Sequence, residues 1–234
     1  MRVMKDHDVR KAEIIQGAMY LFHTKGYLAT TINSILERLS IAKGTFYHYF
    51  SSKEDVLDAV VAELMSEAAT ELVALRSQTA LSAVDKFNAL LTITRKSRVS
   101  NVDVVREVAR VIYRDENLIL RHKLTLRSIA EIAPHVVSII QQGNAEGVFH
   151  VAAVEETAEA ILMLSDMFLE KSTRMLIDVA TPLGAAAVVR ERSQTALDLF
   201  ERLLGAPPHS LKLEDGGLLD AFCAGLAANE KSEG

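Results

Sequence analysis

Residues 31–53, with the sequence TINSILERLSIAKGTFYHYFSSK, constrain the fold of this chain most. Apolar residues recur there at the i, i+3, i+4 and i+7 spacing of one helical face, at Ile32, Ile35, Leu36 and Leu39. Thr31 precedes this run as a candidate N-cap, a turn of three residues follows it, and a second short helix is predicted over 43–49. Two short helices joined by such a turn form a helix-turn-helix, whose second helix fits the major groove of DNA.

The second predicted helix separates aromatic residues that face a core from polar residues that face outward. Phe46 and Phe50 are expected inside. The outward positions are Lys43, Thr45, Tyr47, His48 and Tyr49. Lys43 and Gly44 begin the helix, where free N–H groups and the helix dipole favour a phosphate, and Gly44 allows close backbone approach. Thr45 and the three rings can reach bases or phosphates; alternatively, the rings are ordinary surface or partly buried side chains.

Residues 8–60 closely resemble the DNA-binding domain of the tetracycline-repressor (TetR) family of bacterial regulators. The phrase KGTFYHYFSSKEDVL is similar to the family's recognition helix and the first turn of its connecting helix, and AMYLFHTKGYLATTINSIL is similar to the preceding helices. The resemblance implies that Thr31 and Lys53 clamp the phosphate backbone and that Asn33 contacts bases. Phosphate contacts of this kind fix the register on DNA, and the bases carry the sequence information.

The chain departs from the family pattern in the turn between the two short helices, where the family commonly has glycine and this chain has Ser40. Either Ser40 adopts a positive φ, at a cost of about 1 kcal/mol, or the turn differs slightly in form. After the second helix, two overlapping pairs have the spacing of a capping box, Ser51 with Glu54 and Ser52 with Asp55. A further helix is therefore expected to begin near residue 53.

Charge is distributed unevenly along the chain. The formal net charge of −5 alone argues against nucleic acid, but residues 1–53 carry eight Lys/Arg against four Asp/Glu. The remaining residues carry 18 Lys/Arg against 27 Asp/Glu. A basic head on an acidic body is typical of a protein that meets phosphates at one end, although chance asymmetry in a globular protein gives the same pattern.

The rest of the sequence predicts helices and no strands. We expect helices over 9–25 (ended by Gly26), 53–76, 82–97, 102–113, 116–141, 155–178 and 184–204. Pro134 should kink or split the helix over 116–141. The predicted fold is all-α, with a helix-turn-helix DNA-binding domain over 1–53 and a larger helical ligand-binding and dimerisation domain over 54–206. A C-terminal linker and tail follow over 207–234, with a short helix near 216–228.

The helix over 155–178 is apolar around most of its circumference, as expected of a helix buried on several sides. The resemblance implies that this helix and the next form a dimer interface, so that a homodimer reads a palindromic double-stranded operator. It also implies an effector pocket among the helices over 82–178, for which a mainly apolar small molecule is the default. The candidate pocket residues are Arg106, Arg110, Tyr113, His135, Met163, Asp166, Met167 and Glu170. A solvated face, an internal ion pair or a core position is the alternative for each.

Other classes of protein have less support in the sequence. No H-E-x-x-H or glutamate-x-x-histidine motif indicates a metal site or an enzyme, the seven histidines are scattered, and the one cysteine, Cys223, excludes an intrachain disulfide. We predict no cofactor, no metal and no catalytic residue. A DNA-binding dimer without a small effector stays open. The N-terminus lacks a signal-peptide core and the apolar runs are too short for a bilayer, so a cytoplasmic protein with no membrane contact is expected.

Overall fold

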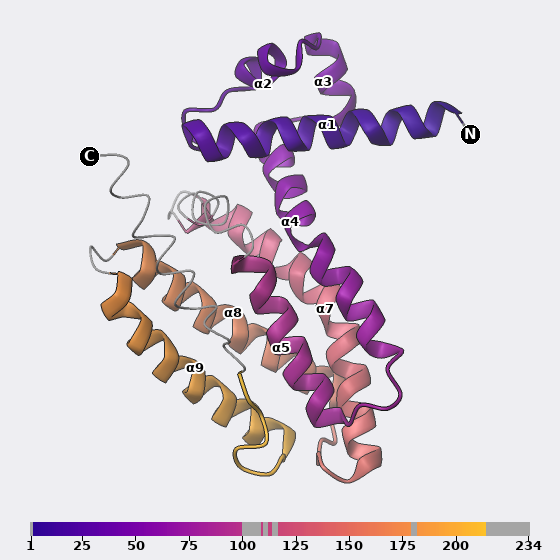
Figure 1. Cartoon of the computed structure of the whole chain (residues 1–234), viewed down its shortest axis with the longest axis vertical. Coiled ribbons are helices and arrows are strands. Elements are labelled where there is room, and N and C mark those ends of the chain that lie inside the picture. Colours follow the sequence, from indigo (N-terminus) through magenta and orange to yellow (C-terminus); the bar gives the residue numbers. More distant parts are fainter. Residues whose placement is uncertain (1, 100–108, 110–111, 114–116, 179–181, 214–234) are drawn as a thin grey trace. The chain divides into compact units, whose positions relative to one another are not determined.

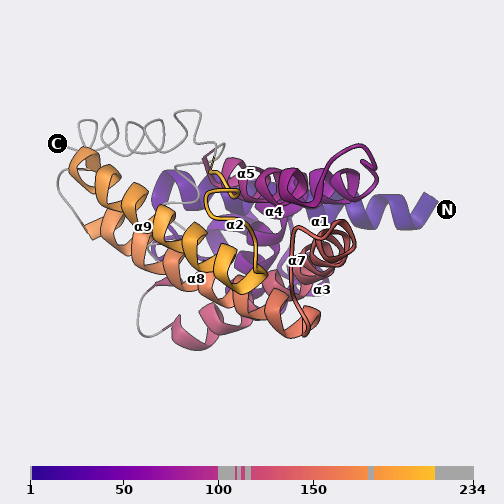
Figure 2. The ribbon, with the colours of Figure 1, turned by 90° about the horizontal axis from the view of Figure 1, so that it is seen from below.

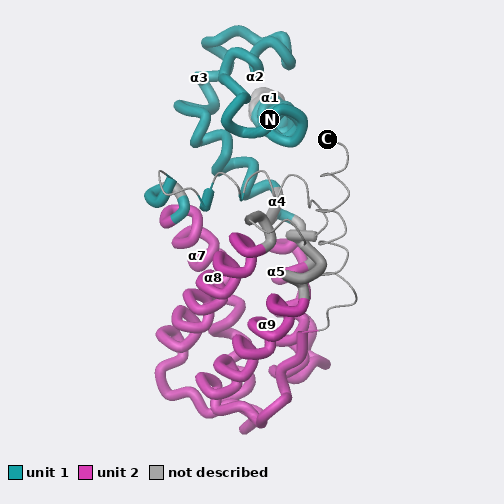
Figure 3. Tube along the Cα trace, turned by 90° about the vertical axis from the view of Figure 1, so that its left-hand side faces the viewer, with its two compact units in different colours: residues 1–66, 103–121 teal, residues 67–102, 122–234 magenta. Residues whose placement is uncertain are grey.

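The computed structural model describes residues 2–99, 109, 112–113, 117–178 and 182–213, and the regular elements among them are all helices (Figure 1). The chain divides into two compact units (Figure 3). Unit 1 comprises residues 1–66 and 103–121, and unit 2 comprises 67–102 and 122–234. The all-α fold predicted from the sequence is confirmed.

Unit 1 is built from the N-terminal helices. They are α1 (Arg2–Lys25), α2 (Ile32–Leu39), α3 (Lys43–Tyr49) and the first part of α4 (Lys53–Arg76). The bounds of α2, α3 and α4 are those predicted, whereas α1 begins earlier than expected. Gly26 ends α1 with a φ of 78°, and its N–H bonds to the Phe22 carbonyl at 3.1 Å. This is the left-handed position that glycine adopts without steric cost.

The core of unit 1 gathers apolar side chains from all four helices. Phe22, Ile35, Phe46 and Val60 are among its fully buried members, and Ile112 packs against the same cluster. The approach of α1 to α2 is close, because a Cβ added at Gly17 would lie 2.9 Å from a methyl carbon of Leu39. Packing against α1 and α4 therefore holds the two short helices, which are too short to be stable alone.

Unit 2 contains the remaining helices, α5 (Ala83–Val99), α7 (Leu118–Glu146) from residue 122, α8 (Val154–Asp178) and α9 (Pro182–Leu204). Helices α8 and α9 pack side by side (Figures 1 and 2). Helix α7 continues through Pro134, so the split suggested by the sequence does not occur. None of the described helices is both long and apolar enough to cross a membrane.

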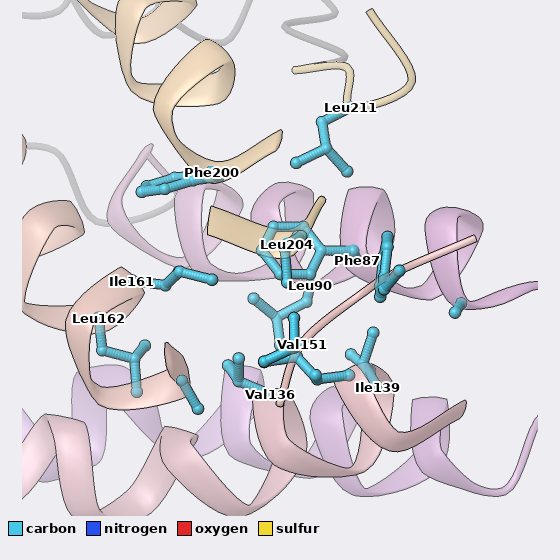
Figure 4. Packing of buried hydrophobic residues seen from close by; sticks show 14 of the residues in the cluster. Phe87, Leu90, Val136, Ile139, Val151, Ile161, Leu162, Phe200, Leu204 and Leu211 are labelled. Atoms are coloured by element: carbon cyan, nitrogen blue, oxygen red, sulfur yellow. The ribbon is translucent and has the colours of Figure 1, made fainter. Parts of the chain in front are cut away.

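The core of unit 2 centres on an aromatic group (Figure 4). The Phe87 ring centroid lies 6.5 Å from that of Phe149 and 6.4 Å from that of Phe200. The segment over 207–213 joins this core, although the sequence suggested a linker there. Leu211 is buried in the cluster, and the buried Glu201 carboxylate accepts the backbone N–H groups of His209 and Leu211, both at 2.9 Å. The expected helix near 216–228 lies outside the described residues.

Candidate nucleic-acid interface

Helix α2 begins with a reciprocal capping box. The Thr31 hydroxyl oxygen accepts the Ser34 backbone N–H at 3.1 Å, and the Ser34 hydroxyl oxygen accepts the Thr31 N–H at 3.0 Å. The predicted N-cap is confirmed, and its partner is a serine. Thr31 and Asn33 are both exposed, so both side chains are accessible from solvent at the start of α2.

The turn between α2 and α3 depends on a left-handed serine. Ser40 has φ 50° and ψ 43°, which is the first of the two alternatives that the sequence left open. The Ile41 N–H bonds back to the Leu36 carbonyl at 3.1 Å, and the Ser40 N–H bonds to that of Glu37 at 3.2 Å. This is the Schellman pattern that ends many helices, in which the left-handed residue is usually glycine. The pattern reverses the chain within three residues and directs it into α3.

Helix α3 presents a polar and aromatic surface around one buried anchor. Phe46 is fully buried, with Phe50 beside it in the core. The exposed residues are Lys43, Gly44, Tyr47 and His48, and Thr45 and Tyr49 are partly buried. Tyr47 meets the Phe46 ring edge-on at 5.5 Å, and His48 meets Tyr49 at 4.9 Å, so neighbouring rings orient the outer ones. All six predicted contact residues of α3 thus have part of their surface accessible.

Gly44 is a glycine that the packing of this protein does not require. A Cβ added there would meet nothing within 4 Å, and the residue does not have a left-handed φ. The absence of a side chain therefore leaves a bare stretch of exposed backbone at the second residue of α3. Such a stretch can be approached closely by another molecule.

The start of α4 is capped by Ser52, whose hydroxyl oxygen accepts the Asp55 N–H at 3.0 Å. The Asp55 carboxylate accepts both the hydroxyl and the backbone N–H of Ser51, the latter at 3.0 Å. These bonds, led by the Ser51 hydroxyl, lower the pKa of Asp55. Of the two predicted pairs, Ser52 with Asp55 is therefore the one that caps α4, and Ser51 adds its own bonds to the same carboxylate.

Lys53 directs its side chain into unit 1. Its Nζ donates hydrogen bonds to the carbonyl oxygens of Tyr27 and Thr30, both at 2.9 Å, and lies 4.1 Å from the centre of the Tyr27 ring. Burial lowers the pKa of Lys53, and the neighbouring Glu54 opposes this effect. Two of the three N–H groups of the ammonium are thus engaged with backbone carbonyls rather than directed outward. This arrangement differs from the phosphate clamp implied by the resemblance.

Arg38 links two helices of unit 1 in a way that the sequence did not indicate. Its guanidinium carbon lies 3.5 Å from the centre of the Tyr20 ring, which ties α2 to α1. An arginine over an aromatic ring at this distance is a favourable cation–π contact. The spacing between the two residues gives no local signal, because they lie on different helices.

Two stretches of the chain match described families. Residues 14–60 match "Bacterial regulatory proteins, tetR family", and residues 100–180 match "Tetracyclin repressor-like, C-terminal domain". The chain belongs to the TetR family of transcriptional regulators.

Individual relatives agree with this assignment. The HTH-type transcriptional regulator YfiR of Bacillus subtilis is 33% identical over 72 residues, which are 30% of this chain and 35% of that protein. The HTH-type transcriptional repressor KstR2 of Mycobacterium tuberculosis is 33% identical over 60 residues, 26% of this chain and 30% of that protein. The chain thus spans about a third of the length of these relatives. A transcriptional regulator from Cytophaga hutchinsonii shares the fold, with a TM-score of 0.59 at 16% identity over 81% of this chain and 95% of that one.

The residues predicted to line an effector pocket in this TetR-family protein fall in different parts of the chain, and that pocket stays a prediction. Arg106 and Arg110 lie outside the described residues, and Tyr113 belongs to unit 1, with Arg121 5.9 Å from its ring centre. Met163 and Met167 are exposed on α8. Among the remaining candidates, Asp166 accepts the Thr125 hydroxyl at 3.3 Å and Glu170 pairs with Arg174 at 3.0 Å.

His135 is the exception among these candidates, because it lies on α7 with 91% of its surface buried. Within the described part of the chain its Nδ1 has no hydrogen-bond partner. Burial, followed by the positive charge of Arg76, lowers the pKa of this imidazole. In the same described ranges, no three His, Cys, Asp or Glu side chains are grouped to hold a metal ion.

Proposed function

We propose that this TetR-family regulator binds a palindromic DNA operator as a homodimer, represses transcription there, and is released by a small, mainly apolar effector. The observation that carries the DNA-binding part is the exposed face of α3, in which Lys43, Gly44, Tyr47 and His48 surround the buried Phe46. Repression is the activity named for the relative KstR2.

The exposed side chains divide into two chemical roles. Lys43 and the Thr31 hydroxyl suit phosphate oxygens, and the bare backbone at Gly44 leaves room for the DNA to approach. The residues proposed to reach bases are Asn33, Thr45, Tyr47, His48 and Tyr49. Amide and hydroxyl groups can bond base edges in the major groove, and aromatic rings can contact thymine methyl groups.

The experiment for DNA binding is selection of bound duplexes from a random pool. We expect enrichment of an inverted repeat whose half-sites are separated by about one helical turn or a multiple, because a two-fold dimer presents two copies of α3. A pool that shows no enrichment would overturn the DNA-binding assignment. An enriched site without inverted symmetry would overturn the homodimer part alone.

The homodimer is supported by apolar surface on the paired helices α8 and α9. Met163, Met167, Val188 and Leu203 each keep between 39% and 42% of their surface exposed. Exposed apolar side chains on two helices that pack together favour a contact with another protein surface. Two copies of this helix pair would form a four-helix interface, and obligate interfaces of that class bury more than about 2,000 Å².

A double substitution tests the interface. Met163→Asp with Met167→Asp should convert a dimer into a monomer in sedimentation at micromolar concentration, because the interface would then bury four unpaired charges. The matched control is Val73→Asp, which places the same charge on a more exposed apolar residue of α4. A monomeric wild-type protein would contradict the dimer, and a double variant that still dimerises would contradict the interface at α8 and α9.

The effector is proposed to bind within the helices over 82–178. His135 gives the proposal its chemistry, because a buried imidazole nitrogen with no partner among the described residues can bond to a polar group on an otherwise apolar molecule. A coupling of about 1–3 kcal/mol would change operator affinity 5- to 150-fold. The test is a thermal-shift screen of small apolar compounds, followed by operator binding with each hit. If no stabilising compound weakens operator binding, the protein is a DNA-binding dimer without an effector.

A further inference from the structure

A hydrogen bond from the Lys53 side chain connects the two ends of the helix-turn-helix. Thr30 immediately precedes the N-cap of α2, and Lys53 begins α4 after the short loop that follows α3. The Lys53 ammonium bonds to the Thr30 carbonyl at 2.9 Å, so it closes the motif across 23 residues of sequence. The Lys53 side chain therefore holds the two ends of the helix-turn-helix at a fixed separation.

The site that receives the ammonium is well defined. The Tyr27 ring lies on one side at 4.1 Å from Nζ, and the Tyr27 and Thr30 carbonyl oxygens are the two acceptors. Tyr27 is buried and packs edge-on against Phe22 at 5.0 Å, which fixes the ring. A compact ammonium with three donors suits such a site, because it can bond both carbonyls while it contacts the face of the ring.

The loop that carries these carbonyls is itself tied down. The Thr30 hydroxyl is fully buried and donates to the Gly26 carbonyl at 2.8 Å, and the Thr30 N–H bonds to the carbonyls of Gly26 and Tyr27. The next residue, Thr31, is exposed and caps α2. Displacement of the Thr30 carbonyl would thus move the first turn of α2, with Thr31 and Asn33 on it.

We infer that Lys53 acts in DNA recognition as a positioning residue, which holds the start of α2 relative to the end of α3, rather than as a phosphate contact. The inference rests on the proposed DNA binding and assigns a role within it. Loss of Lys53 would then affect the fit of the motif to its own operator more than its general attraction to DNA. A phosphate contact would affect both equally and would contribute one charge to the salt dependence.

The experiment compares Lys53→Met with Lys43→Met as the matched control, on the selected operator and on an unrelated duplex, over a series of salt concentrations. For Lys53→Met we expect operator affinity to fall about tenfold, affinity for the unrelated duplex to fall less than about twofold, and the salt slope to stay unchanged. For Lys43→Met both affinities should fall together, with the slope reduced by about one unit. Equal losses and a reduced slope for Lys53→Met would overturn the inference.

Amide hydrogen exchange in the DNA-free protein gives a second readout. Lys53→Met should speed exchange in residues 27–36, whereas Lys43→Met should not, because only the first loses bonds to that loop. Unchanged exchange in Lys53→Met would overturn the inference. If the wild-type protein selected no DNA, the proposed function would fail, and this readout would still report whether Lys53 orders the loop.

A variant of Tyr27 covers the case in which Lys53→Met does not fold. Tyr27→Leu removes the ring beneath the ammonium and alters no charge, whereas Tyr27→Phe keeps the ring. We expect Tyr27→Leu to reproduce the selective loss of operator affinity at an unchanged salt slope, and Tyr27→Phe to bind as the wild type does. Full operator affinity in a folded Tyr27→Leu variant would overturn the inference.

Discussion

Unit 1 and unit 2 differ in how far their polar side chains reach along the sequence. In unit 1 the caps join close neighbours, such as Thr31 with Ser34 and Ser52 with Asp55, and Lys53 is the long-range exception. Unit 2 also has local pairs, such as Glu170 with Arg174, but more of its polar bonds cross between elements, as when Thr125 bonds to Asp166. The comparison teaches that a motif can be recognised from sequence when its polar bonds are local. A helical body held by distant pairs leaves no such pattern.

Core substitutions should give the largest effects and test whether the two units are separate. Phe46→Ala and Phe87→Ala each remove a fully buried ring, at a cost of about 3–5 kcal/mol. We expect Phe46→Ala to abolish operator binding and to speed amide exchange in α1–α3, with α8 and α9 still protected. Phe87→Ala should instead speed exchange in α8 and α9.

The same exchange experiment can break the comparison. If either substitution lowered protection equally in α1–α3 and in α8–α9, the two units would unfold as one. The contrast between local bonds in unit 1 and distant bonds in unit 2 would then have no counterpart in how the two units unfold.

The next effect is confined to recognition. Tyr47 keeps 48% of its surface exposed, so Tyr47→Ala should weaken operator binding by about 1–3 kcal/mol while the thermal midpoint stays nearly constant. Leu28→Ala is the control, because Leu28 is similarly exposed and lies outside the motif. Unchanged operator affinity in a folded Tyr47→Ala, Lys43→Ala double variant would show that α3 is not the helix that contacts the operator.

The helix-turn-helix of unit 1 could be predicted from sequence in considerable detail. The bounds of α2 and α3, the cap at Thr31 and the buried Phe46 follow from residue types within a few positions of one another. The site that holds Lys53 could not be predicted in the same way. Its acceptors are the backbone carbonyls of residues 26 and 23 positions earlier. Every residue has a backbone carbonyl, so the residue types at those positions do not indicate the contact.

For unit 2 the sequence predicted the helices but not how they pack. The pattern of α8 indicates apolar faces on several sides, but it does not say which side meets this chain's core, and Met163 and Met167 prove to be exposed. The segment over 207–213 contains two prolines and was predicted to be a linker, yet Leu211 is buried. Its position depends on the Glu201 carboxylate, whose two bonds to backbone N–H groups leave no signal in the identities of the residues that donate them.

A smaller pair of effects compares the same helix ending in the two units. The turn after α2 and the turn after α7 both have a left-handed residue followed by an N–H bonded five residues back, with Ser40 in the first and Gly147 in the second. Ser40→Gly should raise the free energy of unfolding by about 1 kcal/mol, and Gly147→Ser should lower it by a similar amount. Chemical denaturation measures both. A destabilised Ser40→Gly variant would mean that the serine side chain contributes more than its backbone strain costs.

The smallest effect concerns pH and separates a buried group of unit 2 from an exposed group of unit 1. Burial and Arg76 lower the pKa of His135 in the folded state, so on acidification below its unfolded value of about 6.5 the unfolded chain binds the proton first. His135 should therefore reduce stability as the pH falls from 7.5 to 5.5. Asp55 in unit 1 also has a lowered pKa, but its contribution is lost only below its unfolded value, near pH 4.

The measurement is the thermal midpoint at pH 7.5 and 5.5 for the wild type, for His135→Leu and for the exposed control His122→Leu. We expect the decrease in midpoint to be smaller for His135→Leu than for the other two proteins, because removal of the buried imidazole removes its preferential protonation in the unfolded chain. Equal decreases in all three proteins would show that His135 takes up its proton as easily in the folded state as in the unfolded chain. The buried His135 imidazole could not then be the group that meets an effector, and the polar chemistry proposed for unit 2 would have to lie elsewhere.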